Sequence, residues 1–311
     1  MFGQRGGKQE KIMAISELIV RPIEVRRRHP LIGAEVSGLD LSRPLDEATC
    51  RRLHDLWMEH LVLVFPGQAI SDEQHIAFGR NFGELEIHVS VAHRSSRNVE
   101  IYRVSNVDEA GNILPSKETA WQYINLSWLW HTDSSFRQVP SKGSILHGLE
   151  VTNAGGNTLF ANMYAAYDGL SEELKKRIEG MWVIHDHDHI LSLSPELSKK
   201  KDKGNYDALP PVRHPLVQIH PVTRRRCLLL SPHTMVNIDG MAPTEGRALL
   251  DALIDHSIAD KYVYRHAWAK DDVIMWDNRC TMHSVEPFDN ASVRRVMHRV
   301  TLVGEAGPLL A

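Results

Sequence analysis

The chain of 311 residues has few cysteines, no long apolar run and no strong net charge. Its cysteines, Cys50, Cys227 and Cys280, are odd in number and far apart. That pattern resembles neither a disulfide framework nor a zinc site, and it favours a reducing cytoplasm. No apolar run approaches the length that spans a bilayer, so we expect no membrane partner. The net charge of −3 gives no reason to expect nucleic acid, because that binding needs clustered Lys and Arg.

Several motifs of other enzyme classes are also missing. The sequence has no glycine-rich phosphate loop of the Rossmann or Walker type, no internal repeat and no G-x-S-x-G elbow of a Ser-His-Asp hydrolase. Basic runs at 26–28, 199–203 and 224–226 lack interleaved aromatic residues, which indicates solvated loops. The remaining composition, 42% hydrophobic and 24% charged, is that of an ordinary globular protein.

The start of the chain, MFGQRGGKQEK, is polar and basic and lacks the apolar centre of a secretion signal. We therefore expect residues 1–12 to be a flexible tail. Residues 13–311 are then expected to form a single domain, which is large enough to bury its own core.

Apolar spacing and turn signals predict a chain of many short strands. Helical spacing or caps predict helices at 46–60, 71–83, 171–180 and 244–258, with only one of them between about 97 and 205. Strands are predicted at 61–65, 99–104, 143–151, 157–163, 215–221, 227–232, 261–268, 272–277 and 294–303. The segment 190–210 has little periodicity and predicts a long loop. This pattern favours a mainly β fold, a sandwich, barrel or jelly roll, with flanking helices.

The stretch 128-WLWHTDSSF-136 places a histidine and an aspartate two positions apart. On a strand, His131 and Asp133 would share a face. Two histidines and one carboxylate on one face of a metal leave three positions open, as in non-haem iron(II) oxygenases. In a chain with 18 histidines a lone His-x-Asp is a weak signal, and a hydrogen-bonded surface pair is the alternative.

The stretch 273–303 adds the missing elements. A buried-looking strand ends at 276–278, His283 follows, and the next strand carries three arginines. Arg295, Met297 and Arg299 share one face of that strand, whereas Arg294 points the other way. Two cations that point into an apolar barrel are costly unless anions meet them, and bound carboxylates would meet that need.

In combination these segments resemble the iron(II)- and 2-oxoglutarate-dependent dioxygenases of the taurine and phenoxyacetate-herbicide type, the TauD/TfdA family. The resemblance covers nearly the whole chain from about residue 30. The matching segments are FGEL at 82–85, WHTD at 130–133, GGNT at 155–158, WDNR at 276–279 through His283, and RRVMHR at 294–299. The resemblance implies a double-stranded β-helix core, also called a jelly roll or cupin-like fold, and a dimer or tetramer.

The resemblance also implies a cofactor set and its ligands. His131, Asp133 and His283 would bind Fe(II), and 2-oxoglutarate and O2 would be co-substrates. Arg295 would hold the distal carboxylate of 2-oxoglutarate, for which the planar guanidinium is well suited, and Thr158 would hydrogen-bond the same group. We choose Arg295 over Arg294 from the Arg-x-x-x-Arg spacing. The reaction would yield succinate, carbon dioxide and a hydroxylated substrate.

Two features of the resemblance point to different substrates. Arg299 matches an arginine that relatives use for an anionic head group, and His88 matches a histidine that taurine-type members place on a sulfonate. The run DSSF at 133–136 and the run WDNRC at 276–280 look more like phenoxyacetate-type members. We expect a small organic anion, preferably an aryloxyalkanoate that is cleaved after hydroxylation. A sulfonate or sulfate ester is the alternative, and a zinc hydrolase or a non-catalytic jelly-roll binding protein is a more remote one.

Other histidines compete for the role of metal ligand. In HDHDH at 185–189, His185, His187 and His189 would share a face on a strand, yet no partner segment matches the family pattern. We interpret this run as a solvated or hydrogen-bonded cluster. Structural or surface roles are expected for His147, His214, His220, His233, His266 and His298.

Overall fold

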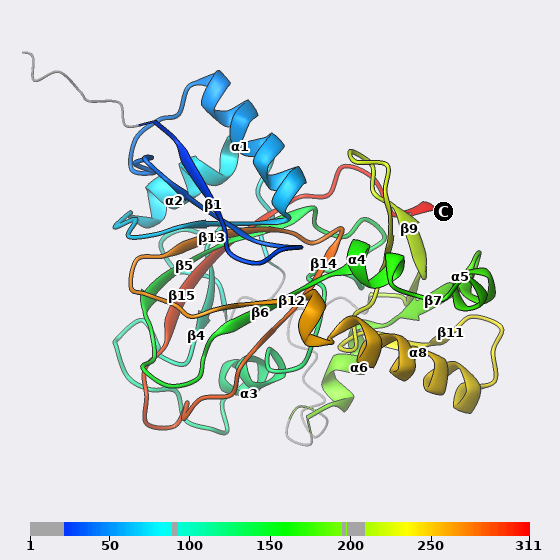
Figure 1. The fold of residues 1–311 in the computed structure, drawn as a ribbon. Coiled ribbons are helices and arrows are strands. Elements are labelled where there is room, and N and C mark those ends of the chain that lie inside the picture. The colour runs from blue at the N-terminus through cyan, green and yellow to red at the C-terminus, as the bar shows by residue number, and fades with distance from the viewer. Residues whose placement is uncertain (1–21, 89–92, 195–196, 198–208) are drawn as a thin grey trace, which may run out of the picture.

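The computed structural model describes residues 22–88, 93–194, 197 and 209–311. The expected tail at 1–12 and most of the expected loop beyond residue 194 lie outside the described residues, so the division into a tail and one domain stays a prediction. Figure 1 shows strands at the centre and helices around them. This mainly β architecture with flanking helices is the expected one. No described helix is both long and apolar enough to cross a membrane.

A sheet of seven strands forms one wall of the molecule. It is antiparallel apart from one pair, β2 with β3. Its order is β1 (Glu24–Arg27), β2 (Ala34–Ser37), β3 (Val62–Phe65), β13 (Val273–Asp277), β5 (Gly143–Glu150), β15 (Val296–Leu302) and β4 (Tyr102–Ser105).

Three smaller sheets, each of three strands, complete the β structure of the described residues. The first, which carries His283, has the order β12 (Val263–His266), β6 (Thr158–Asn162) and β14 (Thr281–Val285). The others are β11 (Met235–Ile238), β7 (Trp182–His185), β8 (Val212–Pro215), and β10 (Arg226–Leu228), β9 (Val217–Ile219), β16 (Leu309–Leu310).

The side chains of the large sheet alternate between two cores. Leu63 and Met275 point toward α1 (Glu47–His60) and α2 (Asp72–Arg80), where they join one apolar cluster. Val64 and Trp276, one position away on the same strands, join the larger cluster between the sheets. This alternation is the period of two that a strand imposes.

The same alternation on β15 confirms the predicted face. Met297 belongs to the cluster between the sheets, and Arg299 reaches Asp133 on that side. His298 points the opposite way and its Nδ1 lies 2.6 Å from Oδ1 of Asp72 on α2. Arg299 is therefore a cation on the inner face of the sheet, and Arg295, which precedes β15, is also buried.

The predicted helix caps are found where the sequence places them, with one correction. Ser71 and Gln74 form the capping box of α2, and Ser171 caps α5 (Glu172–Ile178). The predicted end of α2 at Gly83 is wrong, because Asn81 already ends the helix. The Asn81 side chain donates to the carbonyls of Ala77 and Phe78 and so satisfies the last turn.

Short elements account for the other differences. Between 97 and 205 the described residues also contain α3 (Thr119–Leu126), α4 (Met163–Asp168) and α6 (His187–Ser192), where the sequence predicts one helix. No side chain caps α3, and α4 begins inside the predicted strand 157–163 because Asn162 caps it. The sequence predicts no strand at β1, which is exposed at every position, or at β2, β7, β11, β14 and β16. The predicted helix 244–258 matches α8 (Pro243–Ser257), which packs along β11, and a 3-10 turn (Asp260–Tyr262) follows it.

Candidate metal centre and substrate cavity

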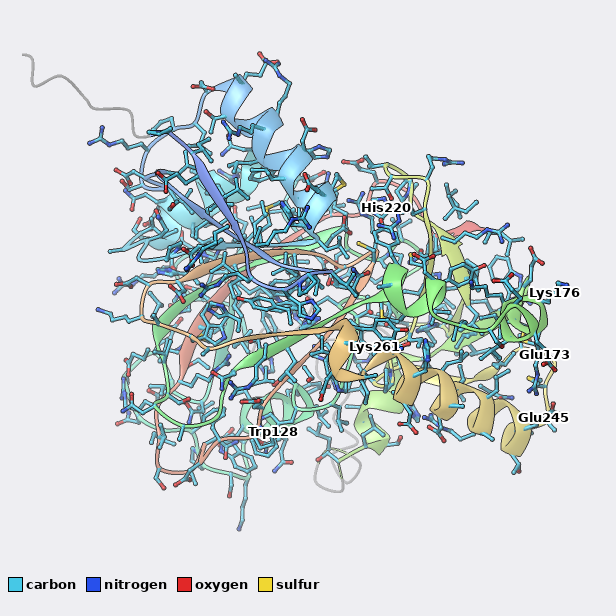
Figure 2. The ribbon with its side chains drawn as sticks, viewed as in Figure 1. Trp128, Glu173, Lys176, His220, Glu245 and Lys261 are labelled. Atoms are coloured by element: carbon cyan, nitrogen blue, oxygen red, sulfur yellow. The ribbon has the colours of Figure 1, made fainter. Side chains whose placement is uncertain are left out.

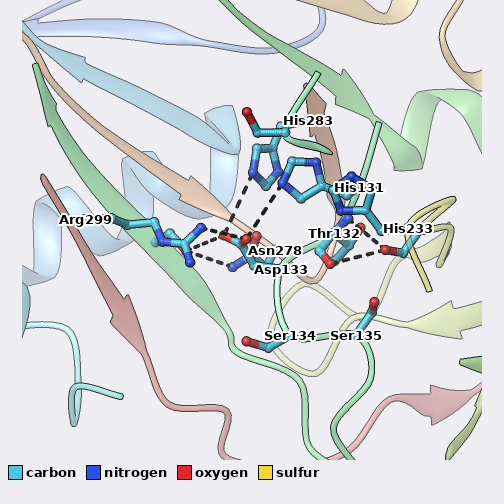
Figure 3. A network of polar contacts seen from close by, with 12 residues as sticks. His131, Thr132, Asp133, Ser134, Ser135, His233, Asn278, His283 and Arg299 are labelled. Carbon is cyan, nitrogen blue, oxygen red and sulfur yellow. Dashed lines mark hydrogen bonds and ion pairs between the residues drawn. The ribbon is translucent and has the colours of Figure 1, made fainter. Parts of the chain in front are cut away.

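His131, Asp133 and His283 converge although the first and the last are 152 positions apart in the sequence. Their ligand atoms all lie within 4.8 Å of one another. Nε2 of His131 is 4.0 Å from Oδ1 of Asp133, and Nε2 of His283 is 3.9 Å from Oδ2 (Figure 3). The predicted metal triad is thus brought together at one point.

The backbone explains the convergence in a way the sequence does not. His131 is paired with His283 of β14 through an isolated bridge, in which each N–H donates to the other's carbonyl at 2.8 Å. Asp133 lies in the turn that follows, so the expectation of a strand through both residues is wrong. Thr132 anchors the turn, because its hydroxyl bonds to the carbonyl of Leu230 at 2.9 Å.

Hydrogen bonds orient two of the three ligands. Nδ1 of His131 donates to the carbonyl of Leu129 at 2.8 Å, which leaves Nε2 for a metal. Oδ1 of Asp133 accepts from Arg299 at 2.7 Å, and Oδ2 accepts from Ser144 at 2.9 Å. The buried Nδ1 of His283 has no hydrogen-bond partner within the described parts of the chain.

Burial and charge set the protonation states that a metal requires. Burial lowers the pKa of His131 to about 3 and that of His283 to about 4, so both imidazoles are neutral near pH 7. Burial would raise the pKa of Asp133, but the charge of Arg299 and the hydrogen bond from Ser144 hold it well below its usual range. Two neutral imidazoles and one carboxylate form the donor set of a non-haem iron(II) site.

A second group of possible ligands, His220, Asp277 and Cys280, lies elsewhere and is engaged within the protein. His220, beside α4 in Figure 2, accepts two backbone N–H groups at Nδ1 and donates from Nε2 to Asp277 at 3.1 Å. Arg279 donates to both oxygens of Asp277, at 2.9 and 2.6 Å. The possible ligand atoms of His220 and Asp277 are thus already hydrogen-bonded within the protein, and Asp277 forms a buried ion pair with Arg279. The expected structural role of His220 is confirmed.

The run HDHDH at 185–189 does not form a metal cluster. His185 ends β7, Asp186 caps α6, and His187 begins that helix, so the histidines do not share a strand. Nδ1 of His185 is hydrogen-bonded to the Thr234 hydroxyl at 2.9 Å, which agrees with a hydrogen-bonded group. The solvated alternative is wrong for His185 and His187, because both are buried.

Arg295 is a buried cation that lacks an anion. It is 2% exposed, and its guanidinium makes no hydrogen bond or ion pair with any residue that the structure describes. Burial lowers its pKa to about 10. The backbone N–H of Arg295 donates to the Asn106 side chain at 2.7 Å, which fixes the start of β15. A guanidinium in this position fits a bound carboxylate, such as that of 2-oxoglutarate.

Arg294 has a different environment from its neighbour. It lies on the surface and forms an ion pair with Glu150, with two nitrogens at 2.7 Å from the carboxylate oxygens. Its charge is therefore already met, which agrees with the choice of Arg295. Thr158, the other residue assigned to 2-oxoglutarate, is buried at the start of β6. Its Oγ1 accepts from Nε1 of Trp268 at 3.0 Å and still has a proton to donate.

A cavity opens beside the metal triad. His88 and Arg299, the residues assigned to the substrate, both line it, together with His131 and Asp133. Burial and the charge of Arg299 lower the pKa of His88 to about 2, so its ring is neutral and can donate one N–H. Rings and apolar chains form most of the remaining wall, among them Tyr102, Tyr123, Ile124, Leu126, Phe136, His187, Ile190 and His233.

Sequence reasoning missed three residues beside the triad. The ring of His233 stacks on that of His131, with centroids 4.3 Å apart and an angle of 16° between the planes. His233 also lines the cavity, which the expected structural or surface role did not include. Ser144 bonds Asp133, and Asn278 bonds Ser144 at 3.2 Å. Of these three residues only Asn278 lies in a recognisable motif, the WDN run at 276–278. Nothing in the sequence marks a lone serine or a lone histidine as part of the site.

Comparison with known proteins places the chain among related enzymes. The family model "Taurine catabolism dioxygenase TauD, TfdA family" matches residues 24–301. The 2,4-dichlorophenoxyacetate dioxygenase of Cupriavidus pinatubonensis is 37% identical over 89% of this chain and 96% of its own. The sulfate ester dioxygenase of Pseudomonas putida is 32% identical over 93% of this chain and 90% of its own.

A solved structure shows the same fold. The crystal structure of AAD-2 in complex with Mn(II) and N-oxalylglycine has a TM-score of 0.81 and 35% identity, and the match covers 93% of this chain and all of the other. The expected jelly-roll core is therefore confirmed. The chain belongs to the TauD/TfdA family, and it is a dioxygenase that uses iron(II), 2-oxoglutarate and oxygen.

Proposed function

We propose that this dioxygenase hydroxylates an aryloxyalkanoate at the carbon that carries the ether oxygen. The cavity carries the proposal, because it has Arg299 and a neutral His88 beside the metal triad and aromatic rings on its remaining walls. An aryloxyalkanoate has a carboxylate at one end and an aromatic ring at the other. Relatives named for 2,4-dichlorophenoxyacetate and for (S)-phenoxypropionate, at 37% and 36% identity, support this substrate class.

In this proposal the residues divide into three groups. His131, Asp133 and His283 hold the iron, and Arg295 and Thr158 hold the distal carboxylate of 2-oxoglutarate. Arg299 and His88 bind the carboxylate of the substrate. When bound, iron(II) with 2-oxoglutarate and oxygen supplies an oxidant for a C–H bond, while 2-oxoglutarate becomes succinate and carbon dioxide.

The protein then determines which C–H bond reacts. Arg299 contacts Asp133, so a carboxylate held by Arg299 lies next to the metal centre, and the carbon attached to it is the nearest C–H donor. Tyr102, Tyr123 and Phe136 offer ring surfaces for the aryl group and exclude water from that side. Hydroxylation there gives a hemiacetal, which splits into a phenol and a 2-oxo acid.

A sulfate ester or alkylsulfonate is the second candidate. A guanidinium and an imidazole N–H can also donate hydrogen bonds to the oxygens of a sulfonate or sulfate. The relative from Pseudomonas putida that is named for sulfate esters supports this alternative. The two substrate classes differ in what the apolar wall contacts, an aromatic ring in one and an alkyl chain in the other.

The test is a substrate screen with purified protein, iron(II), 2-oxoglutarate and ascorbate. Aryloxyacetates, aryloxypropionates, alkylsulfonates and sulfate esters are each added, and succinate is measured, with phenol release as a second readout. We expect an aryloxyalkanoate to increase succinate formation and to release one phenol per succinate. Faster turnover of the alkylsulfonates or sulfate esters, without phenol release from any aryloxyalkanoate, would select the second candidate. The homo-oligomer and the cytoplasmic location stay predictions.

A further inference from the structure

A chain of buried hydrogen bonds runs from the end of β13 to the metal-ligating carboxylate. Nε1 of Trp276 donates to Oδ1 of Asn278 at 2.8 Å, and Nδ2 of Asn278 donates to Oγ of Ser144 at 3.2 Å. Oγ of Ser144 then donates to Oδ2 of Asp133 at 2.9 Å. Figure 3 shows Asn278 and Asp133 within one network of polar contacts. Trp276, Asn278 and Ser144 are at most 2% exposed.

The direction of each bond in this chain is fixed by chemistry. An indole N–H can only donate, so it must meet the oxygen of the Asn278 amide. The amide NH2 group therefore points at Ser144, whose oxygen accepts from it. The one proton of the Ser144 hydroxyl is then left for Asp133, whose ionised carboxylate can only accept. The donor at Trp276 thus determines the orientation of every group up to the metal ligand.

Separate contacts hold the backbone around Asn278 in place. Asp277, between Trp276 and Asn278, forms the buried ion pair with Arg279 and accepts a hydrogen bond from His220. The backbone N–H of Asn278 donates to the carbonyl of Lys142 at 3.1 Å. Asn278 is therefore anchored through its own backbone and through its neighbour, which lets its side chain act as a rigid support.

We propose that Ser144 and Asn278 are positioning residues that orient the Asp133 carboxylate for metal binding. The other donor to this carboxylate, Arg299, lines the cavity and is the residue assigned to the substrate anion. Ser144 does not line the cavity, and it lies on β5, a central strand of the large sheet. It is thus the donor whose bond to Asp133 does not depend on what occupies the cavity. This inference rests on the assignment of the metal triad.

The protein contains a matched control for Ser144. Nδ2 of Asn278 also donates to Oγ of Ser141, at 3.0 Å, and Ser141 is as deeply buried, at 1% exposed. Ser141 does not bond to Asp133. Ser141→Ala and Ser144→Ala therefore each remove one hydroxyl that accepts from the Asn278 amide, and only Ser144→Ala also removes a hydrogen bond to the metal ligand.

The experiment measures the dissociation constant for Mn(II) by electron paramagnetic resonance in the whole protein without substrate. Partners of metal ligands typically contribute 10–100-fold to metal affinity, so we expect Ser144→Ala to weaken Mn(II) binding about tenfold. Asn278→Ala should weaken it by a similar factor, and the Ser144→Ala/Asn278→Ala double variant should be no weaker than Ser144→Ala alone, because Asn278 acts through Ser144. Ser141→Ala should stay within twofold of the wild type.

Two further measurements separate positioning from packing. Ser144→Cys keeps a donor at this position but a weaker one, and we expect its affinity to lie between those of the wild type and Ser144→Ala. Thermal unfolding of each variant without metal reports any loss of packing. Equal Mn(II) affinity of Ser144→Ala, Ser144→Cys and Ser141→Ala would overturn the positioning role. Unchanged Mn(II) binding by His131→Ala would instead overturn the triad on which the inference rests.

Discussion

The guanidinium of Arg299 donates to the carboxylate of Asp133, with Nη1 2.7 Å from Oδ1. The residue assigned to the substrate anion is thereby in contact with a residue assigned to the metal. Both side chains are largely buried, so each charge stabilises the other. Substrate binding and the electrostatics of the metal centre are linked through this pair.

Replacing Arg299 is therefore expected to affect the organic substrate more than 2-oxoglutarate. Loss of a buried hydrogen-bonded charge typically costs 2–5 kcal/mol, so Arg299→Gln should lower kcat/KM for the aryloxyalkanoate at least about 30-fold. Steady-state kinetics with each substrate varied in turn compares the effect of the substitution on the aryloxyalkanoate with its effect on 2-oxoglutarate. An unchanged KM for the aryloxyalkanoate would remove Arg299 from the substrate site.

Arg295 and Arg294 form a matched pair for the 2-oxoglutarate site. Arg295→Gln should raise the KM for 2-oxoglutarate more than about tenfold, because the variant loses the bidentate charge-assisted bonds. Arg294→Gln, which loses only a surface ion pair with Glu150, should leave that KM within about twofold. Kinetics with 2-oxoglutarate as the varied substrate decide the matter, and the reverse ranking would show that the assignment of the two arginines is inverted.

Thr158→Val tests the second contact to 2-oxoglutarate with a side chain of similar shape. A neutral hydrogen bond contributes about 1 kcal/mol, so the KM for 2-oxoglutarate should rise about fivefold. The variant also loses the bond from Trp268, so its unfolding temperature is measured in parallel. If only the unfolding temperature changed, Thr158 would be a structural residue that does not contact the co-substrate.

The buried ion pair around Asp277 should dominate the stability of the turn between β13 and β14. Removing one partner of a buried pair typically costs 3–5 kcal/mol, so Asp277→Asn should lower the free energy of unfolding by about 3 kcal/mol at pH 7. Denaturant unfolding of metal-free protein measures this loss. A change below about 1 kcal/mol would show that Arg279 and His220 find other partners.

The same pair gives a pH dependence of known sign. Burial would raise the pKa of Asp277, but Arg279 and His220 hold it well below its usual range in the folded protein. Its contribution is therefore present above the unfolded pKa of about 4 and is lost as the pH falls below that value. The stability gap between wild type and Asp277→Asn should narrow between pH 5 and pH 3, and a widening gap would contradict the ion pair.

The sequence could predict the parts of the site that follow from local patterns. The His-x-Asp spacing, His283 after the WDN run, and the shared face of Arg295, Met297 and Arg299 all follow from strand periodicity and motif spacing. The structure brings the three expected metal ligands together and leaves the Arg295 guanidinium without a partner in the described chain. Capping signals at Ser71 and Ser171 also located two helices.

Long-range contacts lie beyond such patterns. Ser144 and Asn278 are 134 positions apart, and their bond depends on β5 and β13 being neighbours in the sheet. The stacking of His233 on His131 likewise depends on how the loop between β10 and β11 folds over the triad. Elements with exposed or uncapped ends, such as β1 and α3, gave no signal because their positions come from tertiary packing.

A crystal of the protein grown with Mn(II) and N-oxalylglycine tests the central claim most directly, through the anomalous signal of the metal. We predict one strong peak bounded by His131, Asp133 and His283, with a carboxylate of the mimic on the Arg295 guanidinium. A peak at His220 and Asp277, or a mimic bound away from Arg295, would contradict the account.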